Sequence, residues 1–271
     1  MSRRFASFPC EGNTLIGTLD TGAATTGLLI VSGGNELRAG AWNSQSRLAE
    51  RIAAAGFPVF RFDRRGVGDS EGPNGEFTMS APDIDAAISA FRAHVPTLRR
   101  VVAYGNCDGA SALMLTQGAG SHALVLANPW TFDPEPEVAD EPMPASMPPA
   151  AIRAHYLRRL TDPRALWRLV TGRVKLGQLA TSLADAARPD GPQTGLAALM
   201  SAGIADFSSP VTILLAERDR TAQAFLANWD KADSRLRTCP DASHSFVEPQ
   251  SFLWLQGQLL AALRGIDAVP R

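Results

Sequence analysis

The sequence predicts an α/β fold with a mostly parallel, twisted sheet that is covered by helices on both faces. Short apolar runs alternate with stretches whose apolar residues recur at helical spacing, a rhythm typical of parallel strands connected by helices. The rhythm is interrupted once and then resumes. We therefore predict three segments: a first part of the sheet domain over 1–128, an insertion over 129–208, and a second part of the sheet domain over 209–271.

Each element is predicted from its local pattern. The chain begins with two short segments that predict a hairpin, and the later strands are apolar runs of the kind that parallel sheets bury. The predicted helices keep apolar side chains on one face, as Ile84, Ile88 and Phe91 do. The predicted strands are 5–8, 15–19, 28–31, 58–62, 101–104, 123–127, 211–215 and 236–239. The predicted helices of the sheet domain are 43–55, 83–94 and 251–263.

The insertion has a different composition from the rest of the chain. Residues 133–149 contain five acidic residues and six prolines, which indicates an irregular connector. Residues 150–160, 165–171 and 176–187 then predict helices, so we expect an inserted helical lid. Lids commonly cover a site, exclude water and shape the substrate pocket. The alternative is a structural appendage that does not contact substrate.

Basic residues are concentrated in the predicted lid. Between 153 and 175 the only acidic residue is Asp162. Such a cluster could bind a phosphopantetheine arm, a carrier protein or an anionic saccharide, although a solvated helix face is the ordinary explanation. Its members are Arg153, Arg158, Arg159, Arg164, Arg168, Arg173 and Lys175.

Composition excludes several classes of protein. The chain has 26 basic and 27 acidic residues, which does not favour a nucleic-acid or membrane-surface protein. The N-terminus lacks the apolar core of a signal peptide, and no apolar run is long enough to span a bilayer. Three widely spaced cysteines, Cys10, Cys107 and Cys239, argue against a disulfide framework and suit a reducing cytoplasm. No paired His/Cys spacing favours a metal, and we expect no cofactor.

A glycine-flanked cysteine at the end of a predicted strand is the most informative motif. Residues 105–109 are Gly-Asn-Cys-Asp-Gly, and small residues that can begin a helix follow. This is the context of a nucleophile elbow, with the sulfur of Cys107 in place of the commoner serine hydroxyl. A Cβ two residues to either side would crowd so sharp a turn, and the N–H groups of the following helix would favour a thiolate.

A cysteine nucleophile requires a base, and His244 is the predicted one. In elbow architectures the chain order is nucleophile, acid, histidine. His244 lies in a loop of small residues after the last strand and before the last helix, where this histidine belongs. We expect surface positions for His94 and His122. His155, in the predicted lid, is a further histidine that could reach the substrate.

The base requires an orienting acid, and Asp219 is the predicted one. It follows the strand predicted over 211–215 and precedes His244 in the chain. It would fix the tautomer of His244 and stabilise the imidazolium. Glu217 is the nearest competitor, unless it is a solvated charge at the strand end.

The loop after the first parallel strand supplies candidates for an oxyanion hole. One donor should be the backbone N–H of Asp108, directly after the nucleophile. The loop contains Gly33 and Gly34, which allow the backbone to approach a bound carbonyl closely. We predict Gly34 as the second donor, with Asn35 as the next candidate. An ordinary strand–helix turn is the alternative.

The stretch 63–70, Asp-Arg-Arg-Gly-Val-Gly-Asp-Ser, is the other dense motif. Its glycine N–H groups and arginines could bind an anion. A turn held by local charge pairs beneath the elbow is the interpretation we favour. No Gly-Lys-Ser/Thr sequence follows, so this is not a Walker motif.

Together these motifs resemble the α/β-hydrolase superfamily. The resemblance is carried by the glycine-flanked elbow, the 63–70 turn, and the ordered Asp219 and His244, and it spans roughly 1–128 and 209–271. It implies an α/β-hydrolase fold with an inserted helical lid.

A closer resemblance is to the exosortase A system-associated hydrolase 1 family. It is carried by Gly-Asn-Cys-Asp-Gly-Ala at 105–110, Asn-Pro-Trp at 128–130, and the stretches 155–160 and 219–225. Members of that family accompany exosortase and exopolysaccharide loci, and the resemblance supplies no substrate. The family typically has a Tyr-Tyr pair where this chain has His155 and Tyr156, which leaves the substrate contacts of the lid open. Dienelactone hydrolases also use an elbow cysteine but resemble this chain less in the lid.

These observations predict a cysteine-nucleophile hydrolase that cleaves or transfers an acyl group from an ester or thioester through an acyl-Cys107 intermediate. Because thioesters are open to attack by amines and thiols, transfer competes with hydrolysis. The alternatives are an acyltransferase or thioesterase for a carrier-bound or saccharide-linked acyl group, and a non-catalytic, ligand-binding descendant of the fold. We expect a small-molecule or carrier-linked acyl substrate, no nucleic acid and no membrane span, and we leave a homodimer open.

Overall fold

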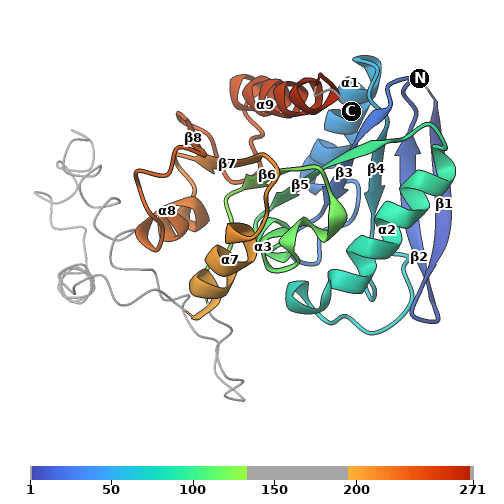
Figure 1. The fold of residues 1–271 in the computed structure, drawn as a ribbon, viewed down its shortest axis with the longest axis horizontal. Coiled ribbons are helices and arrows are strands. Elements are labelled where there is room, and N and C mark those ends of the chain that lie inside the picture. Colours follow the sequence, from blue (N-terminus) through green and yellow to red (C-terminus); the bar gives the residue numbers. More distant parts are fainter. Residues whose placement is uncertain (1, 133–194, 269–271) are drawn as a thin grey trace, which may run out of the picture.

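One eight-stranded sheet forms the centre of the structure, a computed structural model that describes residues 2–132 and 195–268 (Figure 1). The strand order is β1-β2-β4-β3-β5-β6-β7-β8. Strands β3 to β8 are parallel, whereas β2 pairs antiparallel with both β1 and β4. The strands are β1 (Arg3–Cys10), β2 (Asn13–Asp20), β3 (Thr26–Val31), β4 (Val59–Phe62), β5 (Arg100–Asn106), β6 (Ala123–Ala127), β7 (Val211–Ala216) and β8 (Leu236–Cys239).

The first two strands form a tight hairpin at one edge of the sheet. Cys10 pairs with Asn13, which leaves Glu11 and Gly12 as the turn. Both turn residues have positive φ, 45° and 81°, as two-residue hairpins with a right-handed twist require. The predicted hairpin is confirmed.

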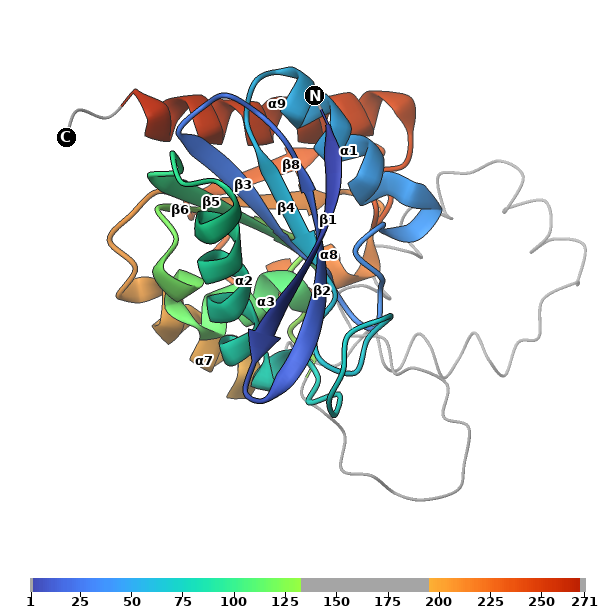
Figure 2. The ribbon, with the colours of Figure 1, turned by 90° about the vertical axis from the view of Figure 1, so that its right-hand side faces the viewer.

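Helices cover both faces of the sheet, because alternate side chains of each parallel strand point to opposite faces. Leu28 and Ile30 of β3 pack with α1 and α9, whereas Leu29 and Val31 pack with α2 and α3. Figure 2 shows α1 and α9 above the sheet and α2, α3 and α7 below it. The α-helices are α1 (Ser44–Ala54), α2 (Ala81–His94), α3 (Asp108–Leu115), α7 (Gly195–Ala205), α8 (Arg220–Ala227) and α9 (Pro249–Asp267), and the short 3-10 turns are η1 (Ala41–Asn43), η2 (Phe77–Met79) and η3 (Gln117–Gly120).

The predicted fold class is confirmed. All eight predicted strands and the three predicted helices of the sheet domain are present, with ends displaced by a few residues. None of the helices within 2–132 and 195–268 has the length and apolarity needed to cross a membrane.

Two α-helices of the described residues were not predicted. Helix α8 follows Asp219, and its Ala222 and Phe225 join the core. Helix α7 lies in the stretch assigned to the insertion, but its Leu196, Met200 and Ile204 are buried in the core cluster that includes α3. The predicted connector 133–149, the predicted lid helices and the basic cluster lie outside the described residues. The boundaries of the insertion stay a prediction.

Candidate active site

The candidate residues lie at the carboxyl ends of the parallel strands. Cys107 directly follows β5, Asp219 follows β7 and His244 follows β8. In open α/β sheets, sites lie outside the carboxyl ends of the strands. The topology thus brings together three residues that are up to 137 positions apart in the sequence, from 107 to 244.

Cys107 has a strained backbone. Its φ and ψ are 59° and −130°, a region that residues with a Cβ rarely adopt. The strain is held in place by neighbouring hydrogen bonds: the Cys107 N–H donates to the Ala127 carbonyl at 3.0 Å, and the Cys107 carbonyl accepts from the Ala110 N–H at 3.1 Å. The side chain is half-buried at the start of α3. This geometry is that of the predicted elbow.

The glycines that flank Cys107 are required by close backbone packing. A Cβ on Gly105 would lie 2.5 Å from the carbonyl carbon of Gly109, and a Cβ on Gly109 would lie 2.5 Å from the carbonyl oxygen of Val31. Real Cβ atoms essentially never approach backbone this closely. The prediction that a Cβ two residues to either side would crowd the turn is confirmed.

His244 and Asp219 contact each other directly. The His244 Nδ1 atom lies 2.9 Å from the Asp219 Oδ2 atom. The same carboxylate oxygen accepts from the backbone N–H of Ala222 at 3.1 Å, because Asp219 is the N-cap of α8. The cap fixes the direction of the carboxylate, and the carboxylate in turn fixes the imidazole.

Glu217, the competing acid, contacts a different loop residue, Asp241. Its carboxylate accepts a hydrogen bond from the Asp241 N–H at 3.0 Å. Of the two acids that the sequence left open, the structure therefore brings Asp219, and not Glu217, to His244.

The surroundings of His244 favour its charged form. Burial by itself lowers the pKa of the imidazole, but the hydrogen bond with Asp219 and the neighbouring Cys107 thiol outweigh burial and raise the pKa to about 10. An imidazolium beside Cys107 stabilises negative charge on sulfur. The pair is thereby suited to nucleophilic chemistry.

The remaining histidines are placed differently. His94 is exposed and stacks on Phe60, with ring centroids 6.5 Å apart. His122 is half-buried, and its Nδ1 atom accepts from the Val101 N–H at 3.2 Å. Burial, together with Arg92 and Arg100, lowers the pKa of His122. His155 lies outside the described residues.

The predicted oxyanion-hole residues lie beside the elbow, but one donor is occupied. A Cβ on Gly33 would lie 3.1 Å from the Cys107 Cβ atom, so this loop is packed against Cys107. The Gly34 N–H donates to the Asp108 carboxylate. The side-chain oxygen of Asn35 accepts a hydrogen bond from the Asn74 side-chain amide at 2.6 Å.

Asp108 is a largely buried carboxylate at this site. Burial raises its pKa, while Arg64 and the N–H groups of Gly34 and Gly109 oppose that shift. An Arg64 nitrogen lies 3.8 Å from the carboxylate, and the same nitrogen donates to the Gly34 carbonyl. Arg64 thus links the Gly34 loop to the elbow.

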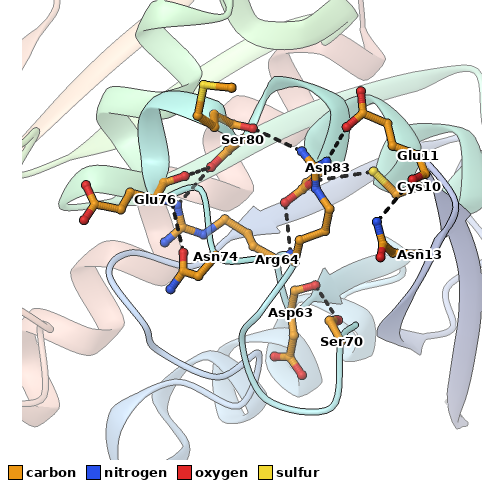
Figure 3. Close-up of polar contacts among 12 residues, drawn as sticks. Cys10, Glu11, Asn13, Asp63, Arg64, Ser70, Asn74, Glu76, Ser80 and Asp83 are labelled. Atoms are coloured by element: carbon orange, nitrogen blue, oxygen red, sulfur yellow. Dashed lines mark hydrogen bonds and ion pairs between the residues drawn. The ribbon is translucent and has the colours of Figure 1, made fainter. Parts of the chain in front are cut away.

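The polar groups of the 63–70 turn are engaged in contacts within the protein (Figure 3). Arg64 donates to the Ser80 hydroxyl at 3.0 Å, and the Ser70 hydroxyl donates to the Asp63 carbonyl at 2.8 Å. The Asp63 carboxylate pairs with Arg38. Arg65 of the turn pairs with Asp83 at 2.5 Å. The charge pairs therefore join the turn to residues outside it, while the bond within the turn is the one from Ser70 to Asp63.

A buried thiol, that of Cys10, lies beside this turn. The Cys10 Sγ atom donates to the Asp83 carboxylate at 3.4 Å (Figure 3). Burial, followed by the contact with Asp83, raises the pKa of Cys10 to about 11. Burial likewise raises the pKa of Cys239. Both thiols are buried, and the raised pKa keeps each of them protonated at neutral pH.

Two further residues, Asn106 and Asn128, are candidates for a role at this site that the sequence alone did not identify. Asn106 and Asn128 both donate from their side chains to the backbone carbonyl of His244. Asn106 is the last residue of β5 and Asn128 directly follows β6, so a polar residue at the end of a buried strand is the signal that could have identified both.

The comparisons with known proteins agree with this architecture. A family model described as the alpha/beta hydrolase family matches residues 28–253. An esterase of Pyrococcus furiosus superposes with a TM-score of 0.61 at 13% identity, covering 97% of this chain and 91% of that chain. The α/β-hydrolase GrgF of Penicillium sp. sh18 superposes with a TM-score of 0.62 at 14% identity, covering 99% and 100%. A thioesterase domain from the curacin biosynthetic pathway superposes with a TM-score of 0.56 at 14% identity, covering 96% and 100%.

No curated protein matches the chain at a significant level. The solved structures are too distant in sequence to carry more than the fold. The family model, however, spans well over half of the chain, from β3 into α9, and includes the elbow and the residues it faces. The chain therefore belongs to the alpha/beta hydrolase family.

Proposed function

We propose that this hydrolase is a cysteine-dependent esterase or thioesterase that works through an acyl-Cys107 intermediate. The observation that carries the proposal is the contact of His244 with Asp219 at 2.9 Å beside a cysteine held in a strained elbow. Nucleophile, base and orienting acid are the three parts that acyl transfer requires. The esterases and the thioesterase among the structural neighbours support acyl chemistry as the reaction class.

In the acylation step, His244 holds the proton that Cys107 has released, and the thiolate attacks the substrate carbonyl. A carbon–sulfur bond forms, and the carbonyl oxygen becomes an oxyanion. The N–H of Asp108, and that of Gly34 once the Asp108 carboxylate has left it, would donate to this oxygen. The intermediate then collapses, and His244 returns its proton to the departing alcohol or thiol.

In the second step an acceptor removes the acyl group from sulfur. With water as acceptor, His244 takes one proton from the water, the hydroxide attacks the thioester, and a carboxylic acid is released. The thiolate leaves and is again paired with the imidazolium. Asp219 keeps the imidazole in the orientation that both steps need.

Transfer of the acyl group from Cys107 to an acceptor other than water is the second candidate reaction. A thioester is attacked by amines and thiols more readily than an oxygen ester is, so an acceptor other than water could compete. Formation of an amide in the presence of an amine, at a rate above that of hydrolysis, would support a transferase. Partition to water alone would favour the hydrolase.

Three finer expectations belong to the same proposal. A carrier-linked or saccharide-linked acyl substrate is one of them, because the basic cluster between 153 and 175 could bind an anionic group. Three unpaired cysteines suit a reducing compartment such as the cytoplasm. A homodimer is consistent with this proposal and is tested by sedimentation of the purified chain.

Trapping of the intermediate tests the proposed function. The protein is mixed with a panel of acyl esters and acyl thioesters, and intact mass followed by peptide mapping locates any adduct. We expect acylation of Cys107, abolished in Cys107→Ala and strongly slowed in His244→Ala, with Cys239→Ala as the control that keeps acylation. Slow and equal modification of all three cysteines, unchanged in His244→Ala, would show that no nucleophile–base pair operates.

A further inference from the structure

We propose that Asn128 is a positioning residue whose side-chain amide fixes the loops that carry the nucleophile, the acid and the base. The inference rests on the proposed function, because it assigns Asn128 a part in the same site. Asn128 follows β6 and is fully buried, and its side chain extends between neighbouring segments of the sheet.

The carbonyl oxygen of the Asn128 amide faces the acid. It accepts from the backbone N–H of Ala216 at 2.8 Å. Ala216 is the last residue of β7, and its own carbonyl accepts from the Asp219 N–H at 3.0 Å. The turn that presents Asp219 is therefore fixed directly to Asn128.

The nitrogen of the Asn128 amide faces the base and the nucleophile. It donates to the His244 carbonyl at 2.9 Å and to the Asn106 side-chain oxygen at 3.1 Å. Asn106 precedes Cys107, and its own amide nitrogen donates to the same His244 carbonyl at 3.3 Å. One pair of asparagines thus joins the elbow to the His244 loop.

The pattern uses the full capacity of the amide. Both N–H groups and the oxygen of Asn128 are engaged, and a buried polar side chain is stable only when it is satisfied in this way. Aspartate and leucine are similar in size to asparagine. Aspartate, however, has no N–H groups to donate, and leucine has no polar atom that could form any of these hydrogen bonds. Asn128 also has a φ of 43°, a conformation that asparagine tolerates better than most residues.

The His244 ring needs this support. Its side chain is 37% exposed and is hydrogen-bonded to Asp219. The two asparagine contacts fix the backbone of His244 at its carbonyl. A displacement of about 1 Å in such a group costs on the order of a hundredfold in rate.

The experiment compares Asn128→Ser with Asn106→Ala and with the control Thr26→Val. Thr26 is equally buried and also loses a side-chain hydrogen bond, to Asp267, but it lies at the beginning of β3, away from the site. We expect Asn128→Ser to slow acylation of Cys107 by about a hundredfold. Asn106→Ala should slow it by about tenfold, because Asn128 keeps its contacts with the His244 carbonyl and the Ala216 N–H. Thr26→Val should lower thermal stability while leaving the acylation rate within a factor of about two.

A second readout separates positioning from stability. NMR of the His244 imidazole in the full chain should show the ring losing its proton at lower pH in Asn128→Ser, because its contact with Asp219 loosens. In Thr26→Val the titration should match that of the wild type. If Asn128→Ser does not fold, Asn106→Ala carries the same two measurements.

The outcomes distinguish this inference from the function on which it rests. If wild-type Cys107 is acylated but Asn128→Ser and Asn106→Ala match it in rate and titration, Asn128 is structural only and the inference is overturned. If wild-type Cys107 is never acylated, the proposed function fails, while the imidazole titration still shows whether Asn128 holds His244 in place.

Discussion

The Asp108 carboxylate accepts a hydrogen bond from the Gly34 backbone N–H, beside the nucleophilic sulfur of the proposed mechanism. That N–H is the donor that the proposed oxyanion would need. A carboxylate in this position competes with the substrate carbonyl for the donor and repels negative charge that develops there. Because burial raises the pKa of Asp108, the charged form is held there at a cost.

Asp108→Asn should therefore speed acylation of Cys107. The amide oxygen is a weaker acceptor than a carboxylate, since hydrogen bonds to charged groups are the stronger ones. If about 1 kcal/mol of the interaction has to be given up before the oxyanion binds, the variant gains roughly fivefold in rate. Stopped-flow acylation with an activated ester measures this step.

The matched control is Glu76→Gln, which removes an exposed charge near Asp108 without touching Gly34. It should leave the rate of acylation unchanged within a factor of about two. A slower Asp108→Asn variant would show that the carboxylate supports the loop in its active conformation.

Asp219→Asn should remove most of the activity while leaving the fold intact. Asparagine is also a good N-cap, but the oxygen that caps α8 is the same one that contacts His244. The amide therefore either keeps the cap with a neutral oxygen beside the His244 Nδ1 atom, or turns its nitrogen to Nδ1 and favours the wrong tautomer. In both cases the imidazolium loses the negative charge that stabilises it. We expect a loss of about a thousandfold or more in kcat/KM, with a small change in Tm.

Glu217→Gln is the comparison for this variant. Its carboxylate accepts from the Asp241 N–H, a contact that an amide oxygen can keep. The activity of Glu217→Gln should stay within about threefold of the wild type. Equal losses in the two variants would contradict the assignment of Asp219 as the orienting acid.

The parts of the fold that the sequence predicts are those with a strong local pattern. The strands around 28–31, 101–104 and 123–127 are short apolar runs, and burial on both faces requires such runs. The elbow is predicted because its strained nucleophile requires glycine on both sides. Cys107, Asp219 and His244 follow from chain order, since each lies just past the end of a strand.

The missed features depend on tertiary contacts. Helix α7 is apolar over much of its surface, and only its packing with α3 and the core shows which side is buried. Helix α8 has eight residues, too few for a clear apolar period. A sequence indicates that the Gly34 and Asp108 N–H groups can act as donors, but the position of the Asp108 carboxylate depends on how two distant loops meet.

Two glycines in different surroundings should respond oppositely to alanine. At Gly105 a Cβ would meet the Gly109 backbone at 2.5 Å, whereas at Gly257 in α9 a Cβ would meet nothing within 4 Å. We expect Gly105→Ala to lower the free energy of unfolding by about 1–3 kcal/mol and to displace Cys107. Gly257→Ala should raise it by about 0.5–1 kcal/mol, because alanine loses less backbone entropy in a helix.

Urea unfolding of the two variants measures this contrast, together with the acylation rate of Cys107. Gly257→Ala should acylate at the wild-type rate, since it lies in a helix on the far side of the sheet from α3. Stabilisation by Gly105→Ala would mean that the elbow has room for a side chain, contrary to its close packing.

The proton on His244 should make stability fall at alkaline pH. Contact with Asp219 and Cys107 raises its pKa from 6.5 to about 10 in the folded chain, against the effect of burial. The folded state therefore binds this proton more tightly than the unfolded state does. The contribution of this proton to the free energy of unfolding is complete below pH 6.5. Above pH 6.5 it decreases, because the unfolded state loses the proton while the folded state keeps it, and it is lost above about pH 10.

His244→Gln isolates this contribution, because other alkaline losses, such as those from the buried Cys10 and Cys239 thiols, are common to both proteins. The free energy of unfolding is measured by urea titration at pH 6, 8 and 10 for the wild type and the variant. The advantage of the wild type over His244→Gln should be largest at pH 6 and smallest at pH 10. A difference that stays constant or grows with pH would mean that the Asp219–His244 contact does not hold the proton, and the imidazolium would then have no part in activating Cys107.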